Sequence, residues 1–388
     1  MAAKKRRKIR EKDLEGYKYF KILIPFLEQL HSVGTERDRA GNRNLFFDQF
    51  AALQLLYFFN PILTSLRAIQ QASELKKVQR ILGCSRAALG SLSEASQVFD
   101  ASVLQEVIAE LVSQVKPLTA PKDLRELEGL TAVDGSLLPA LPKMAWALWL
   151  NETNRAAKMH LGFEVLRGIP VKVSVTEGNG SEKSQLRQML EAGRLYALDR
   201  GYAEYALFQD ILNAGSSFIG RIRNNAVCEL IEERPITPEA KAAGIKRDLV
   251  VRLGCEKSAK ALEVPVHIVE VRTGKTNADG TPQELLLATD RLDLDAELVA
   301  LGYRYRWSVE LFFRWFKCIL GCRHLLSQSE NGLEIQVYVA IIASLLISLW
   351  TGRKPTKRTF EMICLHFSGW ADEEELLAHL EKLKKHDS

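Results

Sequence analysis

The middle of the chain contains an order of predicted strands and helices that few folds can accommodate. From Leu130 to Ile222, apolar segments with the two-residue period of strands are interrupted by two segments of helical period. The order is strand, strand, strand, helix, strand, helix, strand, and a turn at Arg167 to Pro170 joins the second and third strands as a hairpin. Short turns join antiparallel strands, whereas an intervening helix is typical of parallel pairing. The order therefore predicts a mixed sheet in which three antiparallel strands precede parallel ones.

This order resembles that of a ribonuclease H-like core, so the predicted fold class is α/β of the mixed α+β kind. Residues 121–223 and 285–350 form the predicted core. Residues 224–284, which are rich in polar strand-like segments, form a β-rich insertion between the last core strand and the final core helix. Residues 1–120 are predicted to be a helical N-terminal region, and residues 351–388 a helical C-terminal tail.

Helical periodicity in the N-terminal region is clearest in three segments, which are Phe46–Asn60, Ser65–Leu82 and Val103–Val115. None of them matches a helix-turn-helix motif. A helical region of this kind either binds DNA or packs against the rest of the chain, and the sequence leaves both interpretations open.

The net charge of +5 is modest, but its distribution is uneven. Seven of the first twelve residues are Lys or Arg. Such a run is either a solvated tail or an arm that neutralises phosphates. The residues in question are Lys4, Lys5, Arg6, Arg7 and Lys8, followed by Arg10 and Lys12.

The cysteines give no sign of a disulfide framework or a zinc ribbon. The six cysteines are scattered, and no CxxC pair occurs. Cys318, Cys322 and His324 are close in sequence and could suggest a metal site, but no fourth ligand is nearby. We therefore interpret these cysteines as small buried side chains.

No secretory signal is visible at the basic N-terminus, because no continuous apolar run follows it. The most apolar segment, Val337–Trp350, is shorter than the ~20 residues that span a bilayer comfortably. It is predicted to be a core helix, and the cytoplasm is the expected location.

The segment from Tyr303 to Lys317 is predicted to be one helix with a single polar stripe. At ~100° per residue, five polar side chains fall within a narrow arc. The rest of the helix is apolar almost all round, which predicts burial. A charged stripe on a buried helix needs a partner, and we interpret that partner as DNA phosphates. The stripe contains Tyr303, Arg306, Glu310, Arg314 and Lys317.

Three carboxylates are candidates for metal-dependent chemistry. Asp134 and Asp199 lie at the ends of predicted strands that would be neighbours, and Glu310 lies on the helix with the polar stripe. Clustered carboxylates repel one another unless a cation is present, and Mg²⁺ and Mn²⁺ prefer oxygen ligands. Taken singly, a strand-end Asp is most often a turn former, and Arg306 with Glu310 is most often a surface ion pair. The combination favours a shared site.

Three motifs together resemble DDE transposases of the insertion-sequence-four family, whose signature is YREK. VDGS around Asp134 is similar to the first acidic motif of that family, and ALDRGY around Asp199 is similar to the second. The β-rich insertion before the final Glu also matches, and the resemblance covers roughly residues 130–350. The spacing Y-x2-R-x3-E-x6-K is met by Tyr303, Arg306, Glu310 and Lys317.

The resemblance implies a cut-and-paste transposase that acts on double-stranded DNA. Such an enzyme binds terminal inverted repeats, hydrolyses a strand at each end and joins the 3′-ends to target DNA. It works as a homodimer on DNA in the bacterial cytoplasm, in association with the nucleoid. The implied ligands of two Mg²⁺ or Mn²⁺ ions are Asp134, Asp199 and Glu310, with Tyr303, Arg306 and Lys317 on the DNA backbone.

One departure from the family pattern concerns the β-rich insertion, where relatives use a tryptophan to hold a base outside the duplex. None of the six tryptophans lies between Asp199 and Tyr303. A base held in this way would need another side chain, such as Phe218.

Two alternatives to transposition remain open from the sequence. The first is a ribonuclease H-like DNA nuclease that cuts without joining ends. The second is a non-catalytic DNA-binding derivative, against which the intact acidic trio argues.

Overall fold

The structure is a computed structural model that divides the chain into two compact units. One, which we name the helical unit, contains Met1–Lys116, Leu137–Ala157 and Phe313–Ser388. The other, the sheet unit, contains Pro117–Ser136 and Lys158–Phe312. The structure describes residues 28–385 except 32, 40, 42, 61–62, 83–84, 118–121, 141–142, 150–153, 255–261, 278–279, 323 and 368–369.

The long helix α12 (Glu330–Thr351) is the centre of the helical unit. It begins at Ser329, whose hydroxyl accepts a hydrogen bond from the Gly332 N–H, and most of its residues are buried. By length and composition alone α12 could cross a membrane, but 89% of its most apolar window is buried inside the protein. The prediction of a core helix for this segment is confirmed. The other helices of the unit are α2 (Phe47–Phe59), α3 (Leu66–Ser73), α4 (Lys76–Leu82), α5 (Leu89–Val98), α6 (Ser102–Gln114), α13 (Lys357–Phe367) and α14 (Glu373–Lys385).

The N-terminal region contains α2 to α6, and one predicted helix is divided. The segment from Ser65 to Leu82 forms α3 and α4 rather than one helix. The Gln79 side chain donates a hydrogen bond to the Ser73 carbonyl, and the Ser73 hydroxyl accepts one from the Ala87 N–H. These contacts satisfy polar groups at the end of α3 that a continuous helix would satisfy internally.

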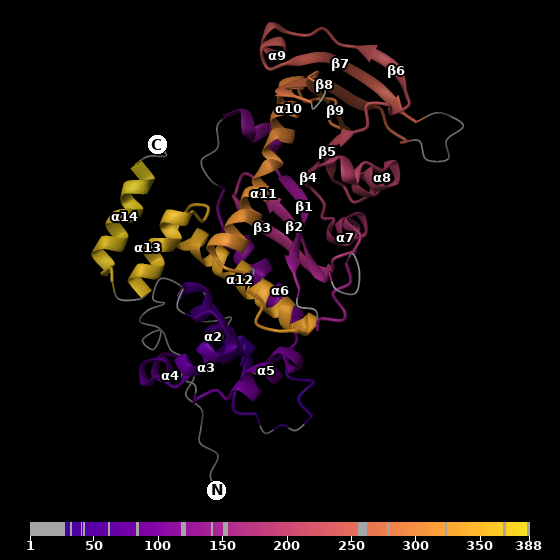
Figure 1. Ribbon diagram of the computed structural model, residues 1–388. Helices are drawn as coiled ribbons and strands as arrows, with labels where there is room; N and C mark the ends of the chain where they lie inside the picture. The colour runs from indigo at the N-terminus through magenta and orange to yellow at the C-terminus, as the bar shows by residue number, and fades with distance from the viewer. Residues whose placement is uncertain are drawn as a thin grey trace. The chain divides into compact units, whose positions relative to one another are not determined.

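In the described part of the chain, nine strands form one sheet with the order β3-β2-β1-β4-β5-β9-β8-β7-β6 (Figure 1). The pairings β1–β4 and β4–β5 are parallel. Val165 N donates to Leu130 O, and Ala140 N donates to Arg155 O, which is the pattern of antiparallel β1 and β2. The predicted core order is thereby confirmed. Its strands are β1 (Leu130–Pro139), β2 (Ala156–Glu164), β3 (Ile169–Glu177), β4 (Leu195–Leu198) and β5 (Ser217–Ile222).

The sheet unit places different helices on the two faces of the core strands (Figure 1). Alternate residues of β4 point to opposite faces, so Leu195 and Ala197 join one apolar cluster while Tyr196 and Leu198 join another. The first cluster packs against α10 (Ala296–Tyr305) and the 3₁₀ turn η3 (Lys122–Leu127). The second packs against α7 (Glu182–Met189) and α8 (Tyr205–Asn213).

Helix α10 lies close to the sheet because Gly302 has no side chain. A Cβ at this position would come within 2.7 Å of the Cδ1 atom of Ile219 on β5, which is too close without a shift of that side chain. The following residue, Tyr303, packs against the same apolar cluster. Gly302 thus leaves room for the Ile219 side chain beneath α10.

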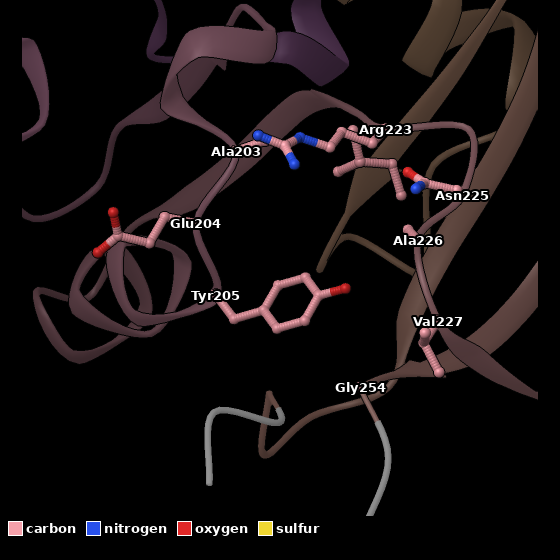
Figure 2. A pocket seen from close by; sticks show the side chains of 9 residues that line it. Ala203, Glu204, Tyr205, Arg223, Asn225, Ala226, Val227 and Gly254 are labelled. Atoms are coloured by element: carbon pink, nitrogen blue, oxygen red, sulfur yellow. The ribbon is translucent and has the colours of Figure 1, made fainter. Parts of the chain in front are cut away.

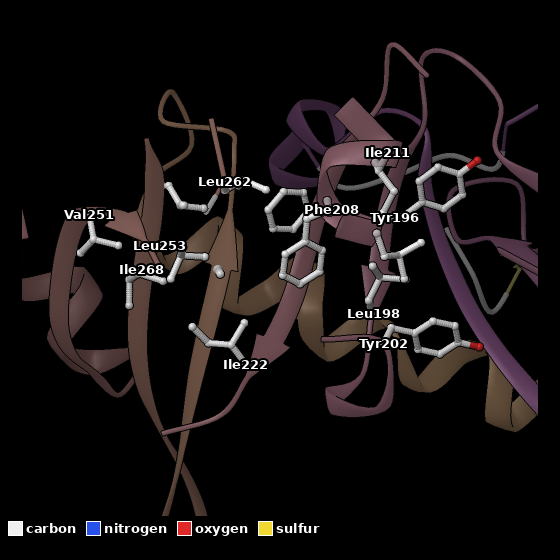
Figure 3. Close-up of a cluster of buried hydrophobic side chains, with 14 of the residues drawn as sticks. Tyr196, Leu198, Tyr202, Phe208, Ile211, Ile222, Val251, Leu253, Leu262 and Ile268 are labelled. Atoms are coloured by element: carbon white, nitrogen blue, oxygen red, sulfur yellow. The ribbon is translucent and has the colours of Figure 1, made fainter. Parts of the chain in front are cut away.

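The predicted β-rich insertion extends the core sheet rather than forming a separate one. Strand β9 pairs with both β5 and β8, and it runs across the predicted end of the insertion at residue 284. Figure 3 shows Val251, Leu253 and Ile268 of the insertion beside Phe208 and Ile222 of the core. The elements of this region are β6 (Cys228–Glu233), α9 (Pro238–Ala242), β7 (Ile245–Leu253), β8 (Val266–Thr276) and β9 (Pro282–Thr289).

The prediction of one continuous, buried helix from Tyr303 to Lys317 is wrong in two respects. The segment contains α10, then α11 (Trp307–Arg314), then a π-helical turn η5 (Trp315–Ile319) in which Leu320 N bonds to Trp315 O. A π-turn changes the angle between successive residues, so the predicted arc does not hold beyond Arg314. Trp307 and Leu311 are also 50% and 46% exposed, because one apolar side of α11 faces away from the protein.

Candidate active site

Asp134, Asp199 and Arg221 form one row across three parallel strands. The prediction that Asp134 ends its strand is wrong, because β1 continues to Pro139, whereas Asp199 follows β4 and Arg221 is near the end of β5. Ala132 pairs with Ala197, and Leu198 pairs with Gly220, so continuing both registers places Asp134 beside Asp199 and Asp199 beside Arg221. Asp199 follows β4 with extended backbone dihedrals, which keeps the alternation of side chains intact. All three side chains therefore belong to the face that α10 covers.

Tyr303, Arg306 and Glu310 of the Y-R-E-K spacing belong to the sheet unit and approach this row from α10 and α11. The Arg306 guanidinium donates a hydrogen bond of 2.7 Å to Glu310 Oε1 and lies 3.8 Å from Asp134 Oδ2. Its cation also lies over the Tyr303 ring, 5.9 Å from the ring centroid. Arg306 is thus placed between two of the three predicted carboxylates, and its side chain is only 15% exposed.

The surroundings of the Asp134 carboxyl group raise its pKa above the ordinary value. Burial raises its pKa to about 6, and the charges of Asp199 and Glu182 act in the same direction. The N–H of Gly135, which donates to Asp134 Oδ1 at 2.8 Å, and the charge of Arg306 act in the opposite direction. The raised pKa shows that burial outweighs the stabilisation of the Asp134 carboxylate by Gly135 and Arg306.

The carboxylates supply the donor chemistry that a divalent metal ion requires. Three Asp or Glu side chains offer hard oxygen ligands of the kind that Mg²⁺ and Mn²⁺ prefer. In the part of the chain that the structure describes, no three His, Cys, Asp or Glu side chains are gathered as a preformed metal site. The residues fit an ion by donor type and by their excess of negative charge, with the Arg306 guanidinium between Asp134 and Glu310.

Glu182 was not identified as a site residue from the sequence. It is the first residue of α7, and its carboxylate lies over the backbone of Gly135, where a Cβ would come within 2.8 Å of its Oε1 atom. It forms an ion pair of 3.4 Å with Lys158 of β2. The motif around Ser181 indicates a helix start, but only the sheet brings that start to Asp134.

Arg221 was also missed, although β5 carries a signal for it. The segment FIGRI of β5 is apolar except for one arginine, which lies at a position that points to the α10 face by alternation. A charge at an inward-facing position of a core strand is unusual, and it marks a candidate functional residue.

The predicted DNA contacts Arg314 and Lys317 lie outside the sheet unit. Arg314 and Lys317 belong to the helical unit, where Arg314 is exposed and Lys317 donates a 3.2 Å hydrogen bond to the Leu137 carbonyl. The basic arm lies outside the described residues. It comprises Lys4, Lys5, Arg6, Arg7 and Lys8.

The interpretation of the cysteines as small buried side chains is correct for only some of them. Cys322 and Cys364 are buried, whereas Cys228 and Cys318 are exposed, and all four are free thiols. Burial raises the pKa of the Cys364 thiol to about 12, so this side chain behaves as an apolar one.

A cavity of about 470 Å³ is lined by residues that follow β4 and by residues at the end of β5, several of which pack against the apolar cluster on the α8 face (Figure 2). Its walls begin at Ala203, four residues after Asp199, and include Arg223, two residues after Arg221. In Figure 2 the Tyr205 ring points into the space, while the Glu204 carboxylate points away from it. The lining residues are Ala203, Glu204, Tyr205, Ile222, Arg223, Asn225, Ala226, Val227 and Gly254.

The suggestion that Phe218 could hold an extruded base is wrong. Phe218 is fully buried and stacks on Phe208, with 4.2 Å between the ring centroids. Both rings belong to the apolar cluster between the sheet and α8, so neither can reach DNA.

The chain is similar to known transposases. The family model for the transposase DDE domain matches residues 125–346. The protein y4zB of Sinorhizobium fredii, named as a transposase, is 28% identical over 222 residues, which are 57% of this chain and 60% of that protein. A protein of Geobacillus stearothermophilus, named as the transposase of insertion sequence element IS5377, is 22% identical over 80% of this chain and 79% of its own length.

Two further similarities involve another transposase sequence and a solved transposase complex. A protein of Synechocystis, named as a transposase for insertion sequence element IS4SA, is 23% identical over 67% of this chain and 71% of its own length. A solved piggyBac transposase synaptic complex with hairpin DNA superposes with a TM-score of 0.47 and 10% identity, over 95% of this chain and 85% of that one.

Proposed function

This chain belongs to the family of transposases with a DDE domain, and we propose that it cuts DNA at the ends of an insertion sequence and joins those ends to target DNA. The observation that supports this most is the row of Asp134 and Asp199 on the sheet face where Glu310 approaches from α11. The order of the three acidic residues along the chain is the order of the DDE motifs.

A DDE domain depends on divalent metal ions, and we propose Asp134, Asp199 and Glu310 as ligands of two Mg²⁺ or Mn²⁺ ions. When bound, the ions supply an activated water or 3′-hydroxyl and stabilise the leaving oxygen of the phosphodiester. The chain positions the donors: β1 and β4 fix the two aspartates, and Arg306 holds Glu310 near Asp134 by its ion pairs. This arrangement limits the reorganisation needed when DNA binds.

The proposal is tested with the purified chain and a supercoiled plasmid that carries both ends of the element. With Mg²⁺, breaks at the element ends followed by joining to a second plasmid are the expected result, and EDTA should abolish both. Cutting without joining would favour the nuclease without transposition. Absence of any metal-dependent cutting would favour the non-catalytic derivative.

We further propose that the active species is a homodimer on paired terminal inverted repeats, located with the nucleoid in the bacterial cytoplasm. Light scattering of the protein with and without a duplex of the element end tests the dimer. A mass of one chain per end in the complex would contradict it.

The basic arm at the N-terminus is proposed to bind DNA phosphates. Each neutralised phosphate contributes about −0.9 to the slope of log affinity against log salt concentration. Removal of residues 2–12, which include seven basic residues, should therefore make the slope less steep by several units. An unchanged slope would identify the segment as a solvated tail.

A further inference from the structure

Arg221 differs from the other arginine of the site in its partners. Arg306 is neutralised by Glu310 at 2.7 Å and by Asp134 at 3.8 Å. The Nε atom of Arg221 is buried and has no hydrogen-bond partner, and no ion pair involves Arg221 among the described residues. Asp199 is near it in the row but forms no ion pair with it. A partly buried guanidinium with an unsatisfied N–H is costly, so an arginine of this kind indicates an anion that binds there.

The position of Arg221 relates it to the acidic residues. Its strand neighbour in the row is Asp199, on the side opposite Asp134. Neighbouring strands are about 4.8 Å apart, so Arg221 is displaced about 10 Å from Asp134 along the row. One DNA strand advances about 3.4 Å per phosphate along its axis, so this displacement corresponds to about three nucleotide steps.

Arg221 also lies near Tyr303 on α10. Burial raises the pKa of the Tyr303 hydroxyl, whereas the charges of Arg306 and Arg221 lower it, so both cations lie near this ring. Tyr303 thus lies near one arginine that forms ion pairs with carboxylates and one that forms none with the residues that the structure describes. The two arginines therefore have different roles in the site.

We propose that Arg221 is a phosphate-binding residue that holds the DNA strand within about three nucleotides of the cut, while Arg306 mainly balances the charge of the carboxylates. The proposal rests on the proposed function, because that function supplies the DNA. The guanidinium is planar and carries five donors, which suits two-point binding of a phosphate. A lysine in its place would keep the charge but lose the two-point contact.

The test combines variants of the full-length chain with modified duplexes of the element end. Each duplex replaces one phosphate near the cut with an uncharged methylphosphonate, and binding is measured by fluorescence anisotropy without metal. With unmodified DNA, we expect Arg221→Ala to weaken binding about 10-fold and to make the salt slope about 0.9 shallower. Arg221→Lys should retain the slope and lose part of the affinity.

The decisive readout is the coupling between side chain and phosphate. At one methylphosphonate position, the wild-type chain should bind the modified duplex more weakly than the unmodified one. At the same position, Arg221→Ala should bind both duplexes with the same affinity. Arg252→Ala is the matched control, because Arg252 is an exposed arginine of β7 paired with Glu229, and its effect should add to that of every methylphosphonate.

Additive effects of Arg221→Ala at every phosphate would overturn the proposal and leave Arg221 as a structural support for Tyr303. If Arg221→Ala does not fold, coupling of Arg221→Lys to a single phosphate decides the question in the same way. Because binding is read without cleavage, failure of the wild type to cut DNA with Mg²⁺ would contradict the proposed function separately.

Discussion

Replacement of Asp134 by Asn is expected to abolish strand cleavage while making the metal-free protein more stable at pH 8. A carboxylate that holds a catalytic ion cannot be replaced by a neutral amide, so the cleavage rate should fall by roughly 10³-fold or more with end binding retained. Asn resembles the protonated acid, which is the form that the buried site favours. Cleavage of a labelled end duplex and thermal unfolding in EDTA measure the two effects.

The pH dependence of this stability gain follows from the raised pKa. Burial moves the pKa of Asp134 from an ordinary 3.8 to about 6, so the folded state binds a proton that the unfolded state has lost. The free energy of unfolding therefore falls as pH rises between these values and stays low above them. At 1.36 kcal/mol per pKa unit, Asp134→Asn should gain about 2–3 kcal/mol at pH 8 and less at pH 5.

Asp293→Asn is the matched control for Asp134→Asn. Asp293 is exposed and accepts hydrogen bonds of 2.6 and 2.7 Å from Arg291, which lower its pKa. Its replacement should bring no stability gain and no loss of cleavage. An Asp134→Asn variant that cleaves at the wild-type rate would remove Asp134 from the site, and one that is less stable at pH 8 would contradict the electrostatic argument.

Replacement of Glu164 by Gln is expected to destabilise the sheet unit by about 3–5 kcal/mol. Glu164 is 8% exposed at the end of β2, accepts two hydrogen bonds of 2.6 Å from Arg167, and pairs with Arg194 just before β4. A neutral amide would leave two nearly buried guanidinium groups without their shared counter-charge. Thermal or urea unfolding of the full-length chain measures the loss.

The pH dependence expected for Glu164 is opposite in sign to that of Asp134. Burial alone would raise the pKa of Glu164, but hydrogen bonds and charges from Arg167 and Arg194 outweigh it and hold the pKa below its ordinary value. The ion pairs thus stabilise the fold above the ordinary pKa of 4.5, and this contribution is lost as pH falls further. The difference between Glu164→Gln and wild type should therefore shrink in acid.

Glu361→Gln provides the comparison for a surface pair. Lys357 and Glu361 are 3.5 Å apart at i and i+4 on α13, with side chains 65% and 55% exposed. Loss of this exposed ion pair should lower the free energy of unfolding by no more than about 0.5 kcal/mol. A Glu164→Gln loss as small as this would show that the network around Glu164 contributes little to the fold.

Helical periodicity predicted only part of the structure of the segment from Tyr303 to Lys317. The i, i+4 spacing correctly predicted that Arg306 and Glu310 meet, although Arg306 lies in the turn between α10 and α11. It did not predict the turn at Arg306, the π-helical turn at Trp315–Ile319 or the exposure of Trp307 and Leu311. Those features depend on hydrogen bonds and packing, which a prediction from a uniform rotation per residue does not take into account.

The sequence by itself determined the order of strands and helices, the identity of the three acidic candidates and the family to which the chain belongs. These are local properties, because alternation, caps and motif spacing are written in consecutive residues. Only the tertiary structure decided which side chains share the site. Strand register brings Arg221 next to Asp199, and the start of α7 lies over Gly135. Neither contact is visible in a linear sequence, since each is set by hydrogen bonding and packing between distant segments.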